Sequence, residues 1–234
     1  MEYEFISTDN YIRCLGVIKE LQNLPSHSHK MALFYGKFGL GKSISIGRLA
    51  TEENAALVRT LGTWTPKSML CDICFELGLD ETGSASTLQH RIIDELIESP
   101  RPIIIDEVDT IQSSKHKDLL LIIRDIHDLA QTPVLFTGME QCIKHFKKDA
   151  HYFSRFVKTV KILPNSKSDI AKYCKSTSIG ISEDLIDYFH MKYANLRQIK
   201  TLLIRLEEYC ENNDYDSANM ELLKASQIEK QHDI

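Results

Sequence analysis

The sequence predicts an α/β fold in which a parallel sheet is flanked by helices and followed by a smaller helical lid. Short apolar, strand-like segments alternate with amphipathic segments from residue 31 onward, a pattern typical of a parallel sheet covered on both faces. A glycine-rich stretch separates the first strand from the next helix, and after residue 163 only helical patterns remain. We therefore expect an N-terminal helix and loop over residues 1–30, an α/β core over 31–163 and a helical lid over 164–234.

The elements of the predicted core follow in a regular order. A helix capped near Thr8 or Asp9 precedes the core and leads into the polar loop PSHSHK. Apolar segments bounded by glycine or proline predict strands at residues 31–36, 55–62, 101–109 and 132–138. Amphipathic segments predict helices at residues 43–54, 65–79, 86–99 and 117–130.

Local features support several of these helices. We expect Ser86 or Thr87 to cap the helix at residues 86–99. The helix at residues 65–79 collects its apolar side chains on one face, namely Met69, Leu70, Ile73, Cys74 and Leu77. After the linker ILPNSKSD, the lid is predicted to contain only helices, at residues 168–175, 182–192, 196–211 and 217–227.

The composition is that of a globular protein with a sizeable core, with 43% apolar and 26% charged residues in 234. The apolar runs are too short to span a membrane, and the N-terminus lacks a basic start followed by an apolar signal core. We therefore expect a cytoplasmic protein whose six cysteines are reduced. His27 and His29 are interpreted as loop residues, because no partner ligands for a metal lie close to them in the sequence.

The net charge of −5 argues against a general nucleic-acid binder, but the charge is uneven. Residues 141–175 contain nine Lys or Arg and two acids. Such a segment is either a local basic face that binds phosphate or an ordinary solvated surface.

The stretch from Gly36 to Ser43, GKFGLGKS, matches the pattern G-x-x-x-x-G-K-[ST] throughout. It follows a predicted strand and opens a predicted helix, the context that distinguishes a phosphate-binding P-loop from a glycine-rich turn. Glycines let backbone N–H groups turn inward around an anion, and the helix adds its positive end. We expect ATP to contact Gly36, Lys37, Phe38, Gly39, Leu40, Gly41, Lys42, Ser43 and Ile44. Lys42 would contact the β and γ phosphates, and Ser43 would ligate Mg²⁺.

A second motif supplies the acids that such a loop requires. The apolar segment PIII ends in Asp106 and Glu107. Asp106 is expected to hold magnesium and its water shell. Glu107 would point to the opposite side, because side chains alternate along a strand, and would polarise the attacking water. The alternative is a strand that merely ends in a polar turn.

Together these motifs resemble those of the AAA+ ATPases, a resemblance that extends from about Phe5 to Gln227. The segment PVLFTG places Thr137 where that family has its sensor 1 residue. The segment FSRF resembles an arginine-finger motif with Arg155 as the finger, and ANLRQIKTLLIRL resembles a sensor 2 helix with Arg197 as the sensor. The resemblance implies that Arg155 completes the site of a neighbouring subunit, while Arg197 acts on the phosphate of its own subunit.

Within AAA+, the chain looks most like the transposition regulators, the family of Mu phage transposition protein B and TnsC. The segments LGTWTPKSML, LFTGMEQCI and NLRQI have this character. The resemblance implies an ATPase that forms filaments or hexamer-like rings with itself on duplex DNA and recruits a transposase. ATP hydrolysis would drive disassembly. We expect a minimal version of this family, without the extra DNA-binding domain of the Mu protein or the partner-binding extensions of several TnsC proteins. The sensor 2 motif is preceded by alanine and asparagine rather than by glycine and asparagine.

DNA contacts are expected where loops of AAA+ assemblies face the central axis. Lys67, Lys115 and Lys117 fall in such segments and could neutralise phosphates, although each is equally well explained as a solvated lysine. Trp64 either stacks on a partner or on DNA, or is a half-buried packing residue. Cys71 and Cys74 form a C-x-x-C pair inside an amphipathic helix, which favours packing over zinc or redox chemistry.

Two other functions remain open. One is an origin initiator or helicase loader, which shares the SRF-like finger. Such proteins usually carry a winged-helix or helix-turn-helix domain, and none is visible in this sequence. The other is a nucleotide-gated scaffold that recruits an effector, in which ATP binding matters more than turnover.

Overall fold

The computed structural model describes residues 5–111, 117–193 and 195–229 and has the expected α/β fold class. These residues divide into two compact units. The α/β unit contains Arg13–Lys37 and Lys42–Ile162, and the helical unit contains the described residues up to Ile12, Phe38–Gly41 and the residues from Leu163 onward. The first helix, α1 (Asp9–Gln22), begins in the helical unit and continues in the α/β unit.

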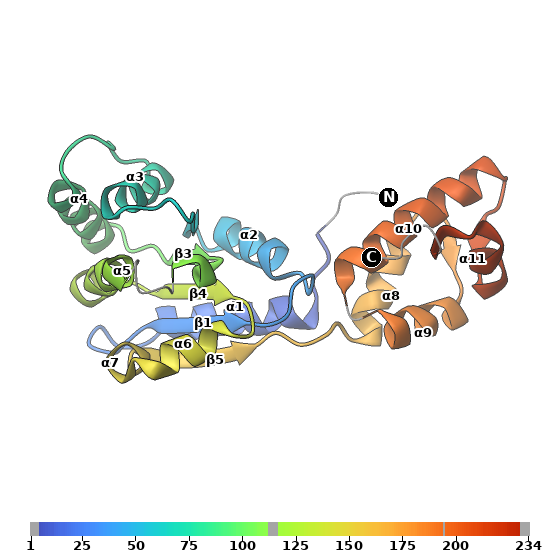
Figure 1. Cartoon of the computed structure of the whole chain (residues 1–234), viewed down its shortest axis with the longest axis horizontal. Coiled ribbons are helices and arrows are strands. Elements are labelled where there is room, and N and C mark those ends of the chain that lie inside the picture. Colours follow the sequence, from blue (N-terminus) through green and yellow to red (C-terminus); the bar gives the residue numbers. More distant parts are fainter. Residues whose placement is uncertain (1–4, 112–116, 194, 230–234) are drawn as a thin grey trace. The chain divides into compact units, whose positions relative to one another are not determined.

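One parallel sheet of five strands forms the centre of the described α/β unit, in the order β2–β3–β4–β1–β5. Figure 1 shows β3, β4, β1 and β5 beside one another, with helices around them. Four of the strands were predicted from their apolar segments, whereas the edge strand β5 was not. The strands are β1 (Met31–Tyr35), β2 (Ala56–Arg59), β3 (Ile103–Asp106), β4 (Val134–Gly138) and β5 (Phe156–Lys161).

The helices of the α/β unit enclose an apolar core. Helices α3, α4 and α5 pack together (Figure 1), and α3 packs against β2. The core contains aromatic side chains from β4 and α6, including Phe136 and Phe146, and the apolar face of α3. The helical elements are α2 (Lys42–Glu52), α3 (Pro66–Leu77), α4 (Ala85–Glu98), η1 (Val108–Ile111), α5 (Lys117–Ala130), α6 (Cys142–Lys148) and α7 (Ala150–Phe153).

Helix boundaries follow local capping chemistry. Thr65 accepts a hydrogen bond from the Ser68 N–H in a capping box, with Pro66 in the first turn, and Gly78 ends α3 with a φ of 74°. All five apolar residues expected on one face of α3 are buried. The expected cap of α4 was wrong: Ser84, rather than Ser86 or Thr87, accepts the N–H of Thr87 at 3.1 Å. The helix therefore starts one residue earlier than predicted.

The helical unit has its own core and is not composed of helices alone. Its helices are α8 (Lys167–Lys175), α9 (Glu183–Lys192), α10 (Leu196–Asn212) and α11 (Met220–Ser226). Two short strands, β6 (Gly180–Ile181) and β7 (Ser217–Ala218), pair in parallel between them, which corrects the prediction of helices only. The fully buried Asp169 on α8 accepts the N–H of Asp9 at 3.1 and 3.2 Å, and so secures the start of α1 within this unit.

Among the described helices, none combines the length and the apolar character needed to cross a membrane.

Candidate functional site

The strand order places three sequence motifs at one edge of the sheet. β1 lies beside β4, and β4 lies beside β3. In a parallel sheet the carboxyl ends of neighbouring strands lie at the same edge, where ligands of open α/β sheets usually bind. The glycine-rich loop follows β1, Asp106 ends β3 and Thr137 lies near the end of β4. The sheet therefore gathers residues that are far apart in the sequence.

The glycine-rich loop has the expected strand–loop–helix context, since it follows Tyr35 and α2 begins at Lys42. Gly39 and Gly41 have φ values of 74° and 85°, in the left-handed region that favours glycine. The Gly36 N–H donates to the Gly138 carbonyl at 3.3 Å, which ties the start of the loop to the end of β4. The loop thus has the irregular backbone that a phosphate cradle requires.

Lys42 is anchored at the mouth of this loop. Its Nζ donates to the carbonyls of Gly36 at 2.8 Å and Lys37 at 2.6 Å. Burial lowers the pKa of Lys42, and the nearby negative charges of Asp106 and Asp109 oppose this effect. The ammonium group therefore lies between the loop and the acids that follow β3, where it can bind a phosphate.

Asp106 is buried and held by several donors. Thr137 donates its hydroxyl hydrogen to Asp106 Oδ1, and the Glu107 N–H donates to the same oxygen at 2.9 Å. The second oxygen, Oδ2, lies 3.5 Å from Nη2 of Arg59. This arrangement fixes the Asp106 carboxylate and places the predicted sensor 1 residue, Thr137, directly against it.

Glu107 is exposed whereas Asp106 is buried, but the predicted strand alternation is not the cause. β3 ends at Asp106, so strand alternation does not extend to Glu107. Instead, Glu107 has a φ of 59° and turns out of the sheet, with 55% of its side chain exposed. Its Oε1 lies 3.7 Å from Nε of Arg59, and its carbonyl accepts the Thr60 hydroxyl at 2.5 Å. Left-handed backbone at a non-glycine residue is uncommon and often marks a functional position.

The donor set suits a magnesium–nucleotide complex. The exposed Ser43 hydroxyl and the Asp106 carboxylate provide hard oxygen ligands, the kind that magnesium prefers. The main-chain N–H groups at the start of α2 and the Lys42 ammonium suit phosphate oxygens. Phe38, within the loop sequence, and Ile44, the residue after Ser43, are both exposed.

The two predicted arginines lie in different units. Arg155 in the α/β unit is paired with Asp128 of α5, whose carboxylate it contacts through Nε and Nη2. Arg197 lies in the first turn of α10 in the helical unit, where Asn195 caps the helix by accepting the Arg197 N–H at 2.9 Å. Their roles at a phosphate stay predictions.

The predicted DNA contacts are only partly described. Lys67 is exposed, but it lies in the first turn of α3 rather than in a loop. Lys115 lies outside the described residues, as does the side chain of Lys117. Trp64 is buried, and its indole N–H donates to Asp72 Oδ2 at 2.7 Å. This contact explains Trp64 as a packing residue.

Much of the basic segment at residues 141–175 is neutralised by acids. Lys158 pairs with Glu20, Lys161 with Glu140, and Lys172 with Asp169, in addition to the Arg155 pair. Lys167 pairs with two acids of α9. The remaining lysines on α6, Lys144, Lys147 and Lys148, are exposed. The segment is therefore less basic in the folded protein than its composition suggests.

The structure also revises the interpretation of His29. Ligand atoms of His29, His127 and Asp128 lie within 4.8 Å of one another, so possible metal ligands do lie close by. However, Nδ1–H of His127 donates to the Thr132 carbonyl at 2.8 Å, and Nε2 faces the Lys30 N–H at 3.4 Å. Both Asp128 oxygens bind Arg155. These protein partners account for the buried groups of the cluster without a metal.

The six cysteines are free thiols. Burial, opposed by the charge of Arg91, raises the pKa of Cys74 to about 11, and the Cys71 Sγ contacts the Glu81 carbonyl at 3.5 Å. These surroundings agree with packing as the role of the C-x-x-C pair.

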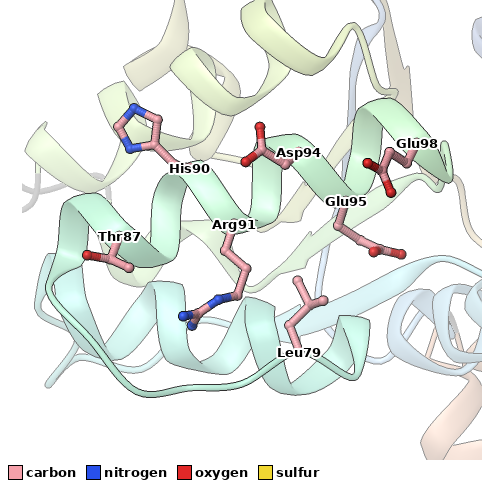
Figure 2. A pocket seen from close by; sticks show the side chains of 7 residues that line it. All are labelled: Leu79, Thr87, His90, Arg91, Asp94, Glu95 and Glu98. Carbon is pink, nitrogen blue, oxygen red and sulfur yellow. The ribbon is translucent and has the colours of Figure 1, made fainter.

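A surface pocket of about 460 Å³ lies apart from the predicted site residues, along α4. Figure 2 shows Asp94, Glu95 and Glu98 along this helix, with Leu79 on the segment below it. The Arg91 side chain is engaged by the carbonyls of Asp80 and Thr82. An acidic rim of this kind does not suit nucleotide phosphates.

Two residues of the site, Arg59 and Asp109, were missed from the sequence. Asp109 was visible in the segment DEVD, but its contact with the Met139 N–H depends on the pairing of β3 with β4. Arg59 ends β2, and its contacts with Asp106 and Glu107 depend on the pairing of β2 with β3.

Comparisons with known proteins agree with this geometry. A family model described as an AAA domain matches residues 22–146, which is more than half of the chain. No curated protein matches the chain.

Solved structures match over nearly the whole chain. The Aeropyrum pernix ORC1 protein in complex with DNA has a TM-score of 0.66 at 17% identity, covering 97% of this chain and 67% of its own. Cdc6p from Pyrobaculum aerophilum has a TM-score of 0.71 at 14% identity, with coverages of 97% and 69%. The Thermotoga maritima RuvB Holliday junction branch migration motor has a TM-score of 0.65 at 16% identity, with coverages of 95% and 69%. At these identities the matches show a shared fold.

Proposed function

This chain belongs to the AAA domain family, and on that premise we propose that it is a magnesium-dependent ATPase that assembles on duplex DNA and regulates DNA transposition. The ATPase activity in this proposal rests on one observation, the convergence of the glycine-rich loop, Asp106 and Thr137 at the carboxyl edge of the sheet.

The proposed chemistry assigns one task to each group. Lys42 and the N–H groups at the start of α2 bind the β and γ phosphates of ATP. Ser43 and Asp106 hold the magnesium ion, which when bound supplies positive charge to the phosphate oxygens. Glu107 orients and polarises water, a task that suits its exposed position beyond the buried Asp106.

Self-assembly would complete the site. In the proposed mechanism, Arg155 reaches the nucleotide of a neighbouring protomer, and Arg197 contacts the nucleotide of its own protomer. In GTPases, an arginine supplied in trans raises the rate of hydrolysis by roughly 10³–10⁵-fold. Hydrolysis then depends on assembly, and the loss of the γ phosphate loosens the contact between protomers. DNA would lie along such an assembly, bound by Lys67, Lys115 and Lys117.

DNA as a partner is supported by the chain's similarity to proteins that act on DNA. One match is the ORC1 protein in complex with DNA, and another is the RuvB branch migration motor. The transposase as a further partner rests on the resemblance of the segments around Trp64, Thr137 and Arg197 to transposition regulators, and we propose the cytoplasm as the place of action.

A second candidate is an origin-initiator or helicase-loader function. It is favoured by the similarity of nearly the whole chain to ORC1 and Cdc6p. A scaffold without significant turnover remains the alternative outcome of the experiment below.

The test combines an ATPase assay with electron microscopy of the purified chain, with and without duplex DNA and Mg·ATP. DNA-coated filaments or rings, with hydrolysis stimulated by DNA, support the proposal, and capture of a transposase supports its transposition role. A tight complex with a replicative helicase would favour the second candidate, and discrete oligomers without DNA or turnover would favour the scaffold. Lys42→Ala serves as the nucleotide-binding control and should remove turnover, and when it is the only subunit present it should also fail to assemble.

A further inference from the structure

Asp109 links the turns that follow two neighbouring strands. It lies in η1, three residues after Asp106, and its Oδ2 accepts a hydrogen bond from the N–H of Met139, which follows β4. The last backbone pair between β3 and β4 is Ile105 with Phe136. Beyond that pair, side-chain contacts hold the strand ends together: Thr137 binds Asp106, and Met139 binds Asp109.

The space around this contact is filled. A Cβ atom placed on Gly138 would lie 2.6 Å from Asp109 Oδ2, 3.0 Å from Cys142 Sγ and 3.1 Å from Val108 Cγ1. These distances are too short for van der Waals contact, so a side chain at residue 138 would displace the Asp109 carboxylate. The absence of a side chain at this position therefore allows the carboxylate to reach the Met139 N–H.

The second carboxylate oxygen of Asp109, Oδ1, is buried without a hydrogen-bond partner among the described residues, which packing alone does not explain. A buried polar atom without a partner costs free energy, more so when it is charged. The charge of Asp109, with that of Asp106, opposes the lowering of the Lys42 pKa by burial. The contact of Oδ2 with Met139 is therefore kept at the cost of a buried Oδ1 that no described residue satisfies.

We propose that Asp109 is a positioning residue of the nucleotide site, which holds the turn after β4 against the turn after β3 and so keeps Thr137 in contact with Asp106. This inference rests on the proposed function, because positioning matters only if Asp106 and Thr137 serve nucleotide hydrolysis. Asp109 acts through other residues, since its bound oxygen contacts a backbone N–H. Small displacements of groups that position a reaction can reduce its rate by about 10²-fold.

The test compares Asp109→Ala with Asp109→Asn. The alanine variant loses the acceptor for the Met139 N–H, whereas asparagine retains a carbonyl oxygen that can accept it. We expect kcat per bound nucleotide to fall about tenfold or more in Asp109→Ala, and to remain within about threefold of the wild type in Asp109→Asn. Affinity for a fluorescent Mg·ATP analogue should change little in either variant, because the phosphate cradle is untouched.

Further measurements distinguish positioning from folding. Gly138→Ala would displace the Asp109 carboxylate and so disturb the same contact with the Met139 N–H. We therefore expect kcat of Gly138→Ala to fall by a similar factor to kcat of Asp109→Ala. The amide proton of Met139, observed by NMR, should shift in Asp109→Ala and Gly138→Ala but not in Asp94→Ala, which removes an exposed acid of α4. A structural role alone would lower the melting temperature and the fraction of binding-competent protein, without lowering kcat per bound nucleotide.

Wild-type kcat per bound nucleotide in Asp109→Ala would overturn the inference, while the proposed function would stand. Absence of hydrolysis in the wild-type protein with DNA and Mg·ATP would overturn the proposed function, and the role of Asp109 with it. The two failures are distinct, because the second is seen before any substitution is made.

Discussion

The guanidinium group of Arg155 contacts both carboxylate oxygens of Asp128, with 2.8 Å between Nη2 and Oδ2 and 3.1 Å between Nε and Oδ1. The hydrogen bonds that Arg155 donates to the Asp128 carboxylate raise the pKa of Arg155. The pair joins α5 to the segment that precedes β5. Arg155 therefore has a structural role within its own chain, which must be separated from its proposed role at a neighbouring nucleotide.

Asp128→Asn tests the structural role. Side-chain exposures of 14% for Arg155 and 31% for Asp128 place this pair between surface and buried ion pairs. We therefore expect the free energy of unfolding at pH 7 to fall by about 1–2 kcal/mol, as measured by chemical denaturation. An unchanged free energy of unfolding would show that the pair contributes little to stability.

The pH dependence of this pair has a definite sign. Burial alone would raise the pKa of Asp128, but the hydrogen bonds and charge of Arg155 outweigh burial and lower it. Since the unfolded aspartate has a pKa of about 3.9, the stabilisation is fully present above that pH and is lost as the pH falls through the lower folded value. The difference in melting temperature between wild type and Asp128→Asn should thus be constant from pH 7 to 5 and shrink below pH 4.

Subunit mixing tests the proposed catalytic role of Arg155. Arg155→Ala should retain nucleotide affinity and lose hydrolysis by roughly 10³-fold or more, the lower end of the effect in GTPases. Mixed with Lys42→Ala, it should regain activity, because the lysine variant supplies Arg155 to the intact phosphate cradle of its neighbour. Arg155→Lys is the matched control, since it keeps the charge beside Asp128 but loses the planar fork. No recovery in the mixture would argue against action in trans.

Glu107→Gln should separate binding from turnover. The substitution keeps the size of an exposed side chain but removes the base, so we expect kcat to fall by about 10²–10⁴-fold with nucleotide affinity retained. Assemblies on DNA should persist after ATP addition, as measured by fluorescence anisotropy of labelled DNA. Glu98→Gln, an exposed acid of α4, should behave as wild type. Rapid release of Glu107→Gln from DNA would contradict the assignment.

Lys67→Ala should weaken DNA binding without changing base preference. If Lys67 contacts one phosphate, its removal should make the negative slope of log affinity against log salt concentration shallower by about one unit. Anisotropy titrations at several salt concentrations measure this slope, and Lys19→Ala, an exposed lysine of α1, is the control. Equal slopes in the two variants would show that Lys67 is a solvated surface lysine that does not contact DNA.

Trp64→Phe should affect stability rather than DNA binding. The substitution removes the donor to Asp72 and reduces the volume of a buried side chain. We expect the free energy of unfolding to fall by about 1–3 kcal/mol, as measured by denaturant titration monitored by circular dichroism. A large loss of DNA affinity in stably folded Trp64→Phe would instead support a stacking role.

Local sequence patterns were sufficient for most elements. Apolar runs identified β1, β2, β3 and β4, and the helical spacing of apolar residues identified the buried face of α3. β5 was missed because its side chains alternate weakly and most of them are exposed at the edge of the sheet. The pairing of β6 with β7 was missed because each strand contributes two residues, too few for a pattern.

The sequence by itself determined the phosphate loop, since its glycines, Lys42 and Ser43 are contiguous and their chemistry is local. It also identified Asp106 and Glu107, but not the left-handed turn that separates their side chains. Only the tertiary structure decided which distant residues meet, including Thr137 with Asp106, Asp109 with Met139 and Arg155 with Asp128. The physical reason is that these contacts depend on strand order and packing between segments, which no local spacing along the chain encodes.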